Sequence, residues 1–146
     1  GTHVDTMTAA AWTAAPVTDA DAVVFDGVAP EASVRSALYV APPNTTGPCP
    51  SDREVTDATV VDWEDDHPAL AGLADLAATP VAHARRLGTP GWAVPVVFAT
   101  DGGQAFPLLV AGEHHGRRIA CLGAVLDVLP HAVELLQGVT EHPKTL

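Results

Sequence analysis

The chain has 146 residues, of which 47% are apolar, and this size and composition fit one folded domain with a hydrophobic core. Eighteen acidic residues against seven basic ones give a formal net charge of −11, which repels phosphate backbones and anionic lipid headgroups and argues against nucleic acid as a partner. The sequence has no stretch of about 18 apolar residues, so we expect no membrane insertion by this chain.

The first residues lack the basic and apolar blocks of a signal peptide. We expect residues 1–18 to be an expression remnant and flexible N-terminal segment, and residues 19–138 to form a single α/β domain. Residues 139–146 are expected to be a frayed tail. The domain should be cytoplasmic, or associated with a membrane through segments absent from this chain.

Two short apolar runs in the first third predict strands. Residues 22–25 and 37–40 are continuously apolar, which is typical of strands buried on both faces in a parallel sheet. The proline-rich residues 42–50 predict an exposed loop. Residues 59–63 predict a third strand, which ends in the acidic turn at 64–68.

The second half is predicted to be rich in strands, with a short helix on either side of them. Two apolar runs, residues 106–111 and 118–126, flank a short polar loop bounded by Gly112 and Gly116, and this pattern predicts a β-hairpin. Further strands are expected at 81–87 and 95–100, and short helices at 69–76 and 130–137.

Four segments of the chain follow, in the same order, the motifs of one known family. They are residues 21–30 (D-x-V-V-x-D-G-x-x-P), 39–43 (a strand ending in a double proline), 61–73 (DW-x-x-x-HP-x-L-x-G-L) and 107–123 (PLL-x-A-G, then G-x-R and an apolar run to L-G). These segments resemble the class I glutamine amidotransferase-like domain of bacterial BatA-type membrane proteins, which also carry von Willebrand type A domains.

The resemblance implies a flavodoxin-like α/β fold: a mixed sheet with flanking short helices and a C-terminal β-hairpin. It also implies a membrane-associated parent protein. The chain departs from the family after the hairpin, where residues 126–130 stand in place of the longer F-D-x-x-x-S-D-L-P-L-R segment. This departure leaves the register of the last helix open.

Neither cysteine is placed for amidotransferase catalysis, which needs a thiolate at a sharp strand-to-helix elbow and a His-x-Glu pair. Cys49 lies between two prolines, which forbid the elbow and the helix after it, and Cys121 lies within a predicted buried strand. The spacing from His131 to Glu134 is one residue too long. We therefore expect a degenerate active site, and the sequence leaves open whether the two cysteines pair.

The densest group of polar side chains is the acidic turn behind Trp63, a residue that we expect in the core. Asp65, Asp66 and His67 offer oxygen ligands for a hard cation, but the turn lacks the glycines that alternate with ligands in calcium loops. A solvated loop, with one aspartate capping the next helix, is the favoured interpretation, so we expect no metal and no cofactor. An alternative function is a small hydrolase or transferase using His67 with Asp65 or Asp66.

The hairpin loop is a second candidate surface. His114 and His115 are adjacent, and adjacent strand residues point to opposite faces, so we do not expect these side chains to share one metal. Trp92 lies between prolines and is a candidate for an exposed binding anchor.

The arginines form two sequence pairs. Arg117 and Arg118 follow the hairpin loop, and they would form a small anion-attracting patch if they clustered with Arg85 and Arg86. Chance placement of the two pairs on adjacent strand edges is an equally favoured alternative.

The sequence thus favours a non-catalytic interaction or ligand-sensing module with a protein or small-molecule partner. A structural dimerisation domain is a further alternative. The binding candidates are Trp63, Asp65, Asp66, His67, Trp92, His114, His115, Arg117 and Arg118.

Overall fold

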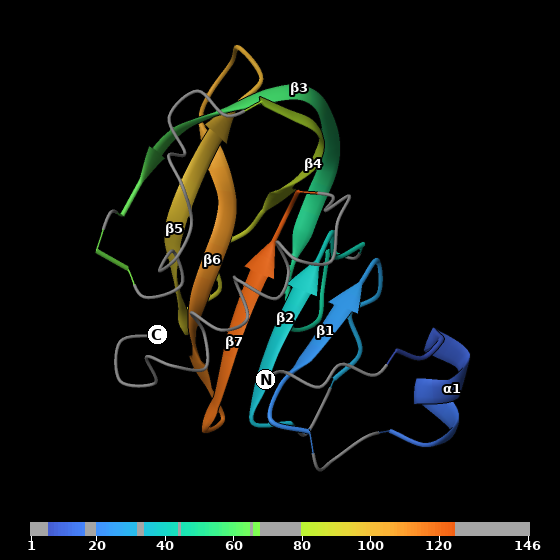
Figure 1. Ribbon diagram of the computed structural model, residues 1–146. Helices are drawn as coiled ribbons and strands as arrows, with labels where there is room; N and C mark the ends of the chain where they lie inside the picture. The colour runs from blue at the N-terminus through green and yellow to red at the C-terminus, as the bar shows by residue number, and fades with distance from the viewer. Residues whose placement is uncertain are drawn as a thin grey trace.

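The computed structural model describes residues 6–16, 20–31, 34–43, 45–64, 66–67 and 80–124. In this part of the chain a seven-stranded mixed sheet is accompanied by one short helix, so the protein has a mixed α/β fold dominated by its sheet (Figure 1). The helix is too short to cross a membrane, and no other described segment is a candidate helical span. The elements are α1 (Ala9–Ala14), β1 (Val23–Asp26), β2 (Ser36–Val40), β3 (Ser51–Trp63), β4 (Pro80–Leu87), β5 (Ala93–Thr100), β6 (Phe106–His114) and β7 (Arg117–Leu122).

The strands lie in the order β1-β2-β7-β6-β5-β3-β4. β1, β2 and β7 are parallel neighbours, and the other pairings between these strands are antiparallel. The strands predicted at 22–25 and 37–40 are confirmed as the parallel pair β1 and β2, but burial on both faces holds only for β2, since Phe25 is the one buried residue of β1. A flavodoxin-like sheet is built of parallel strands, and in the described sheet only β1, β2 and β7 are parallel.

β3 is much longer than the strand predicted at 59–63. It begins at Ser51 and bends over the end of the sheet, with irregularities that shift its register against both neighbours (Figure 1). β4 returns beside it and reaches the end of β7, where Arg85 N donates to Gly123 O at 2.9 Å and Ala84 bridges Ala124. This contact curls β7, β6, β5, β3 and β4 into a barrel-like half of the sheet.

Two glycines allow backbones to approach closely in this half. A Cβ atom added at Gly123 would collide with the carbonyl oxygen of Arg85, and one added at Gly112 would collide with that of Trp92. Only glycine leaves this space free. Both glycines belong to the motif at 107–123, so glycine at these two motif positions is explained by close backbone packing.

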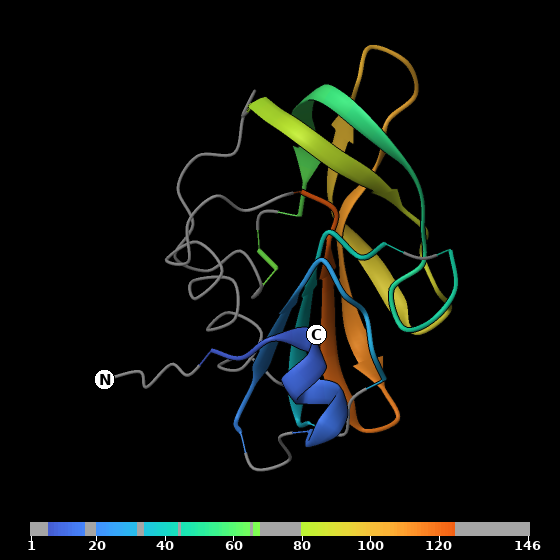
Figure 2. The same ribbon diagram turned by 90° about the vertical axis from the view of Figure 1, so that its right-hand side faces the viewer.

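The buried side chains form two cores. One gathers residues mainly from β3, β5 and β6, with smaller contributions from β2, β4 and β7, and the other joins α1 and β1 to side chains of β2, β7 and the strands beyond them. In the second core Trp12 of α1 is 8% exposed and meets Phe25 edge-on, with 4.9 Å between ring centroids. Figure 2 shows α1 against the parallel part of the sheet. Part of the segment that we expected to be flexible is therefore a packed helix.

Tyr39, in the same core, stacks on Phe25 and donates its hydroxyl to Pro30 O at 2.7 Å. Burial raises the pKa of Tyr39 from 10.0 to about 12, with a smaller rise from Glu31 that Arg117 opposes. Since the folded protein holds the neutral phenol, this group stabilises the fold below pH 10.0, and that contribution is lost as the pH rises towards about 12.

We expect the tyrosinate absorbance of the folded protein to appear with a midpoint near pH 12. The chain has one tyrosine, so the signal needs no assignment, and Tyr39→Phe supplies the baseline. A midpoint at the ordinary value of 10.0 in the folded protein would show that Tyr39 is open to water.

The loop predicted at 42–50 is exposed only in part: Pro43, Thr45, Thr46 and Gly47 are exposed as predicted, whereas other residues of the loop are buried. Pro42, Pro48 and Cys49 are buried, because a disulfide joins Cys49 to Cys121 near the end of β7. Cys121 is buried as predicted, but as a disulfide partner and not as a free apolar side chain. The proline-rich loop is thus attached to the sheet, and the open question of cysteine pairing is answered.

The other predicted elements divide into three groups. The strands at 81–87 and 95–100 are confirmed as β4 and β5. The hairpin is confirmed, but β6 continues to His114, so its loop is only His115 and Gly116, and β7 ends at Leu122 before residue 126. The helices predicted at 69–76 and 130–137 lie outside the described residues.

Candidate functional site

The hairpin tip brings three ring side chains together. His115 and Gly116 have φ values of 53° and 76°, which give the tight two-residue turn that suits the twist of a hairpin. His115 therefore leaves the strand, and its ring lies 3.9 Å from that of His114 between centroids. The expectation that these side chains point to opposite faces is wrong, because it assumed an extended backbone at His115.

Trp92 continues this stack. Its ring lies 5.3 Å from that of His114 at an interplanar angle of 27°, and it also packs against the second core. Trp92 is half-buried, and it stays a candidate for a binding surface. Within the described ranges, no group of three or more His, Cys, Asp or Glu side chains is arranged to hold a metal ion.

The two arginine pairs do not cluster. Arg118 is at the start of β7 and donates from Nε to Ser36 Oγ at 3.2 Å. Arg85 meets β7 beyond its other end, at Gly123, which is about 16 Å further along an extended strand. Arg117 lies near Tyr39 and acts on its pKa. The combined anion patch that the sequence allowed is therefore not formed.

The Trp63–His67 segment forms a turn beside β5. Trp63 is half-buried against the first core, Glu64 N donates to Val96 O at 2.9 Å, and His67 N donates to Glu64 O at 3.0 Å. Burial lowers the pKa of His67, and Glu64 partly opposes this shift. Asp66 is exposed, and Asp65 lies outside the described residues.

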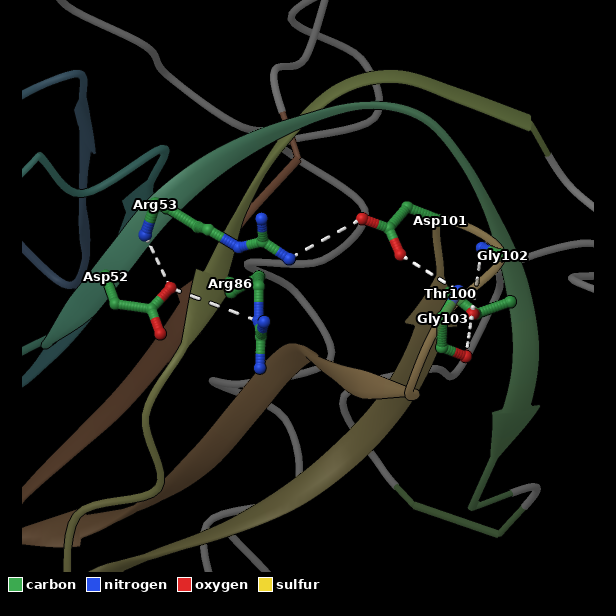
Figure 3. Close-up of polar contacts among 7 residues, drawn as sticks. All are labelled: Asp52, Arg53, Arg86, Thr100, Asp101, Gly102 and Gly103. Atoms are coloured by element: carbon green, nitrogen blue, oxygen red, sulfur yellow. Dashed lines mark hydrogen bonds and ion pairs between the residues drawn. The ribbon is translucent and has the colours of Figure 1, made fainter.

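The structure also shows a group of four charged side chains that we did not expect from the sequence. Asp52 and Arg53 of β3, Arg86 of β4 and Asp101 of the β5–β6 turn lie beneath the bend of β3, and we call these four residues the charged cluster (Figure 3). Arg53 Nη2 lies 3.7 Å from Asp101 Oδ2, and Arg86 Nε lies 4.0 Å from Asp52 Oδ1. The bend of β3 brings these residues together.

Local hydrogen bonds position the Asp101 side of the cluster. Thr100 Oγ1 accepts from Gly102 N at 3.2 Å and donates to Gly103 O at 3.1 Å. Asp101 Oδ1 accepts from Gly103 N at 3.2 Å, and Gly102 has a φ of 101°, which favours glycine. These bonds place Asp101 so that it faces Arg53 across the bend.

The β3–β4 side of the cluster is held by Ser51. Arg85 Nε donates to Ser51 Oγ at 2.9 Å, and Ser51 Oγ donates to Pro42 O at 2.6 Å. Cys49 is two residues before Ser51, so the disulfide is directly linked to the start of β3. Arg86 lies on the first core, with its Cζ 5.8 Å from the centre of the Phe106 ring.

No protein-family model matches the chain, and no curated protein matches its sequence. Among solved structures, it is similar to Cytoplasmic Protein STM3548 from Salmonella typhimurium, with a TM-score of 0.60 and 13% identity over 83% of this chain and 70% of that chain. It is also similar to Cytoplasmic Protein STM1381 from Salmonella typhimurium LT2, with a TM-score of 0.53 and 17% identity over 84% of this chain and 66% of that chain. A third similar structure is Agd3, described as a novel carbohydrate deacetylase, with a TM-score of 0.50 and 11% identity over 71% of this chain and 18% of that chain. At these identities the likeness concerns the fold alone.

Proposed function

We propose that this chain is a non-catalytic interaction or ligand-sensing module of the amidotransferase-like type. The observation that carries this proposal is the Cys49–Cys121 disulfide, which occupies the only two thiols in the chain. Amidotransferase chemistry of class I requires a free thiolate, and a sulfur in a disulfide is not one.

The relationship to the BatA-type amidotransferase-like domain is part of this proposal. It is supported by the positions of the motifs: residues 21–30 contain β1, residues 39–43 end β2, and residues 107–123 contain the β6–β7 hairpin with its two space-limited glycines. A flavodoxin-like arrangement is proposed only for the parallel strands β1, β2 and β7. The antiparallel strands would be this chain's departure from it.

The disulfide also bears on location. Disulfides persist in oxidising compartments and are rare in the bacterial cytosol. Of the two expected locations, we therefore favour association with a membrane, with this domain on the oxidising side, over the cytoplasm.

We propose the charged cluster as the binding surface of the module. Its side chains come from β3, β4 and the β5–β6 turn, so a bound ligand would contact several elements at once (Figure 3). Its two ion pairs are long and partly exposed, and pairs of this kind contribute little to stability. A role in binding would account for charges that do little for the fold.

A turnover assay tests the absence of catalysis. We expect no release of ammonia from glutamine above the buffer rate, either in the oxidised protein or after reduction of the disulfide. Ammonia release that appears on reduction and vanishes in Cys49→Ala or Cys121→Ala would overturn the proposal.

The alternative hydrolase has one supporting observation. Burial lowers the pKa of His67, which favours the neutral imidazole that a general base requires. The same preparations are therefore assayed for ester hydrolysis, with His67→Ala as the matched variant. Hydrolysis that depends on His67 would favour this alternative over a binding module.

A further inference from the structure

The charged cluster balances two arginines against two aspartates, in a protein that is strongly acidic as a whole. Arg53 and Arg86 belong to it, and Arg85 adjoins it, so three arginines accompany two aspartates in a chain of net charge −11. The overall charge repels anions in general. Any anion retained here must therefore be held by specific hydrogen bonds.

The arginines of the cluster retain free hydrogen-bonding capacity. At 3.7 and 4.0 Å, both ion pairs are longer than a hydrogen bond. Arg53 is 61% exposed, and its guanidinium is open to a ligand. The Arg86 side chain is 30% exposed, but its Nε is buried and has no hydrogen-bond partner in the described part of the chain. A ligand would therefore meet the exposed part of the Arg86 guanidinium and not its Nε.

The Arg86 guanidinium is also held in position, whereas Arg53 only faces Asp101. Arg86 is fixed above the Phe106 ring, and the neighbouring Arg85 is fixed by Ser51. Asp101 is fixed by its own turn and faces Arg53. A guanidinium that is held before binding loses less conformational freedom when a ligand arrives.

We propose that the charged cluster binds the oxyanion group of a small ligand, a carboxylate or a phosphate, through Arg53 and Arg86. The planar guanidinium fork matches either group, and Asp52 and Asp101 orient the two arginines in the free protein. The proposal names the ligand class of the binding module and rests on that proposed function. An oxyanion is favoured over a metal ion, because the cluster contains no set of three metal-ligating side chains in the described residues.

The test follows the arginine Nε–H resonances of the intact oxidised chain during titration with inorganic phosphate and, separately, with acetate. Sodium chloride at matched ionic strength is the reference. We expect saturable shifts of the Arg53 and Arg86 signals with at least one of the two anions, and the anion that acts identifies the group. Shifts no larger than those in chloride for both anions would overturn the proposal.

Variants separate a built site from general charge. Arg53→Gln changes an exposed side chain and is expected to weaken binding by about tenfold or more. Arg86→Lys keeps the charge over Phe106 but loses the fork, and a comparable loss is expected. Arg35→Gln removes the same charge at an exposed position outside the cluster and should bind as the unaltered chain does. Equal affinity in all four proteins would overturn the proposal. That result would not affect the non-catalytic assignment, because the glutamine assay tests that assignment independently.

Discussion

Loss of the Cys49–Cys121 disulfide is expected to lower the free energy of unfolding by about 4 kcal/mol. The two cysteines are 72 residues apart in the sequence, so the crosslink removes much conformational freedom from the unfolded chain. Both side chains are fully buried, and Cys49 attaches the proline-rich loop to β7. Chemical denaturation of the oxidised protein, with and without a reductant, measures the effect.

The double variant Cys49→Ala/Cys121→Ala is the control for this prediction. It should unfold near the midpoint of the reduced protein and should not respond to the reductant. Ser51 follows Cys49 closely and accepts a hydrogen bond from Arg85, the neighbour of Arg86. Reduction should therefore also broaden the arginine Nε–H signals of the charged cluster. Unchanged stability on complete reduction would show that the loop is held without the crosslink.

Replacing Gly123 by alanine is expected to cost about 3 kcal/mol, at the upper end of the usual penalty for overpacking. The added methyl would collide with the Arg85 carbonyl oxygen, and the carbonyl carbon behind it is 3.3 Å away. Neither backbone can move freely, since Arg85 N donates to Gly123 O at 2.9 Å and Gly123 N donates to Leu108 O at 2.7 Å. Thermal unfolding measures the loss, and hydrogen exchange of the Arg85 amide reports whether β4 separates from β7.

Gly91→Ala is the matched control, because an added Cβ at Gly91 meets nothing within 4 Å. This variant should stay within about 0.5 kcal/mol of the unaltered protein. If Gly123→Ala were as stable as Gly91→Ala, the closure of the curled half by β4 would be incorrect.

Several strands could be predicted because their hydrophobic pattern is local. The apolar runs that became β1, β2, β5 and the β6–β7 hairpin are visible within a few residues, and glycines mark the hairpin turn. The first half of β3 was missed because Asp52, Arg53 and Glu54 are exposed and give no apolar pattern. That half is a strand only because β4 pairs with it.

The charged cluster could not be predicted for a related reason. Arg53 and Asp101 are far apart in the sequence, and each looks like an ordinary solvated residue in its own segment. They meet because β3 bends over the end of the sheet. The His114–His115 contact was missed for a more local reason: whether His115 takes the left-handed turn conformation depends on where β6 stops pairing with β7.

Composition and local pattern alone were enough to indicate an acidic α/β chain and to place most of its strands. They also indicated that neither cysteine sits in a nucleophile elbow, since two flanking prolines and a strand interior are local facts. The pairing of Cys49 with Cys121, the antiparallel half of the sheet and its closure at Gly123 depended on contacts between distant segments. Such contacts form where backbones, sulfurs and charges meet in space, and short-range sequence patterns carry no record of those distances.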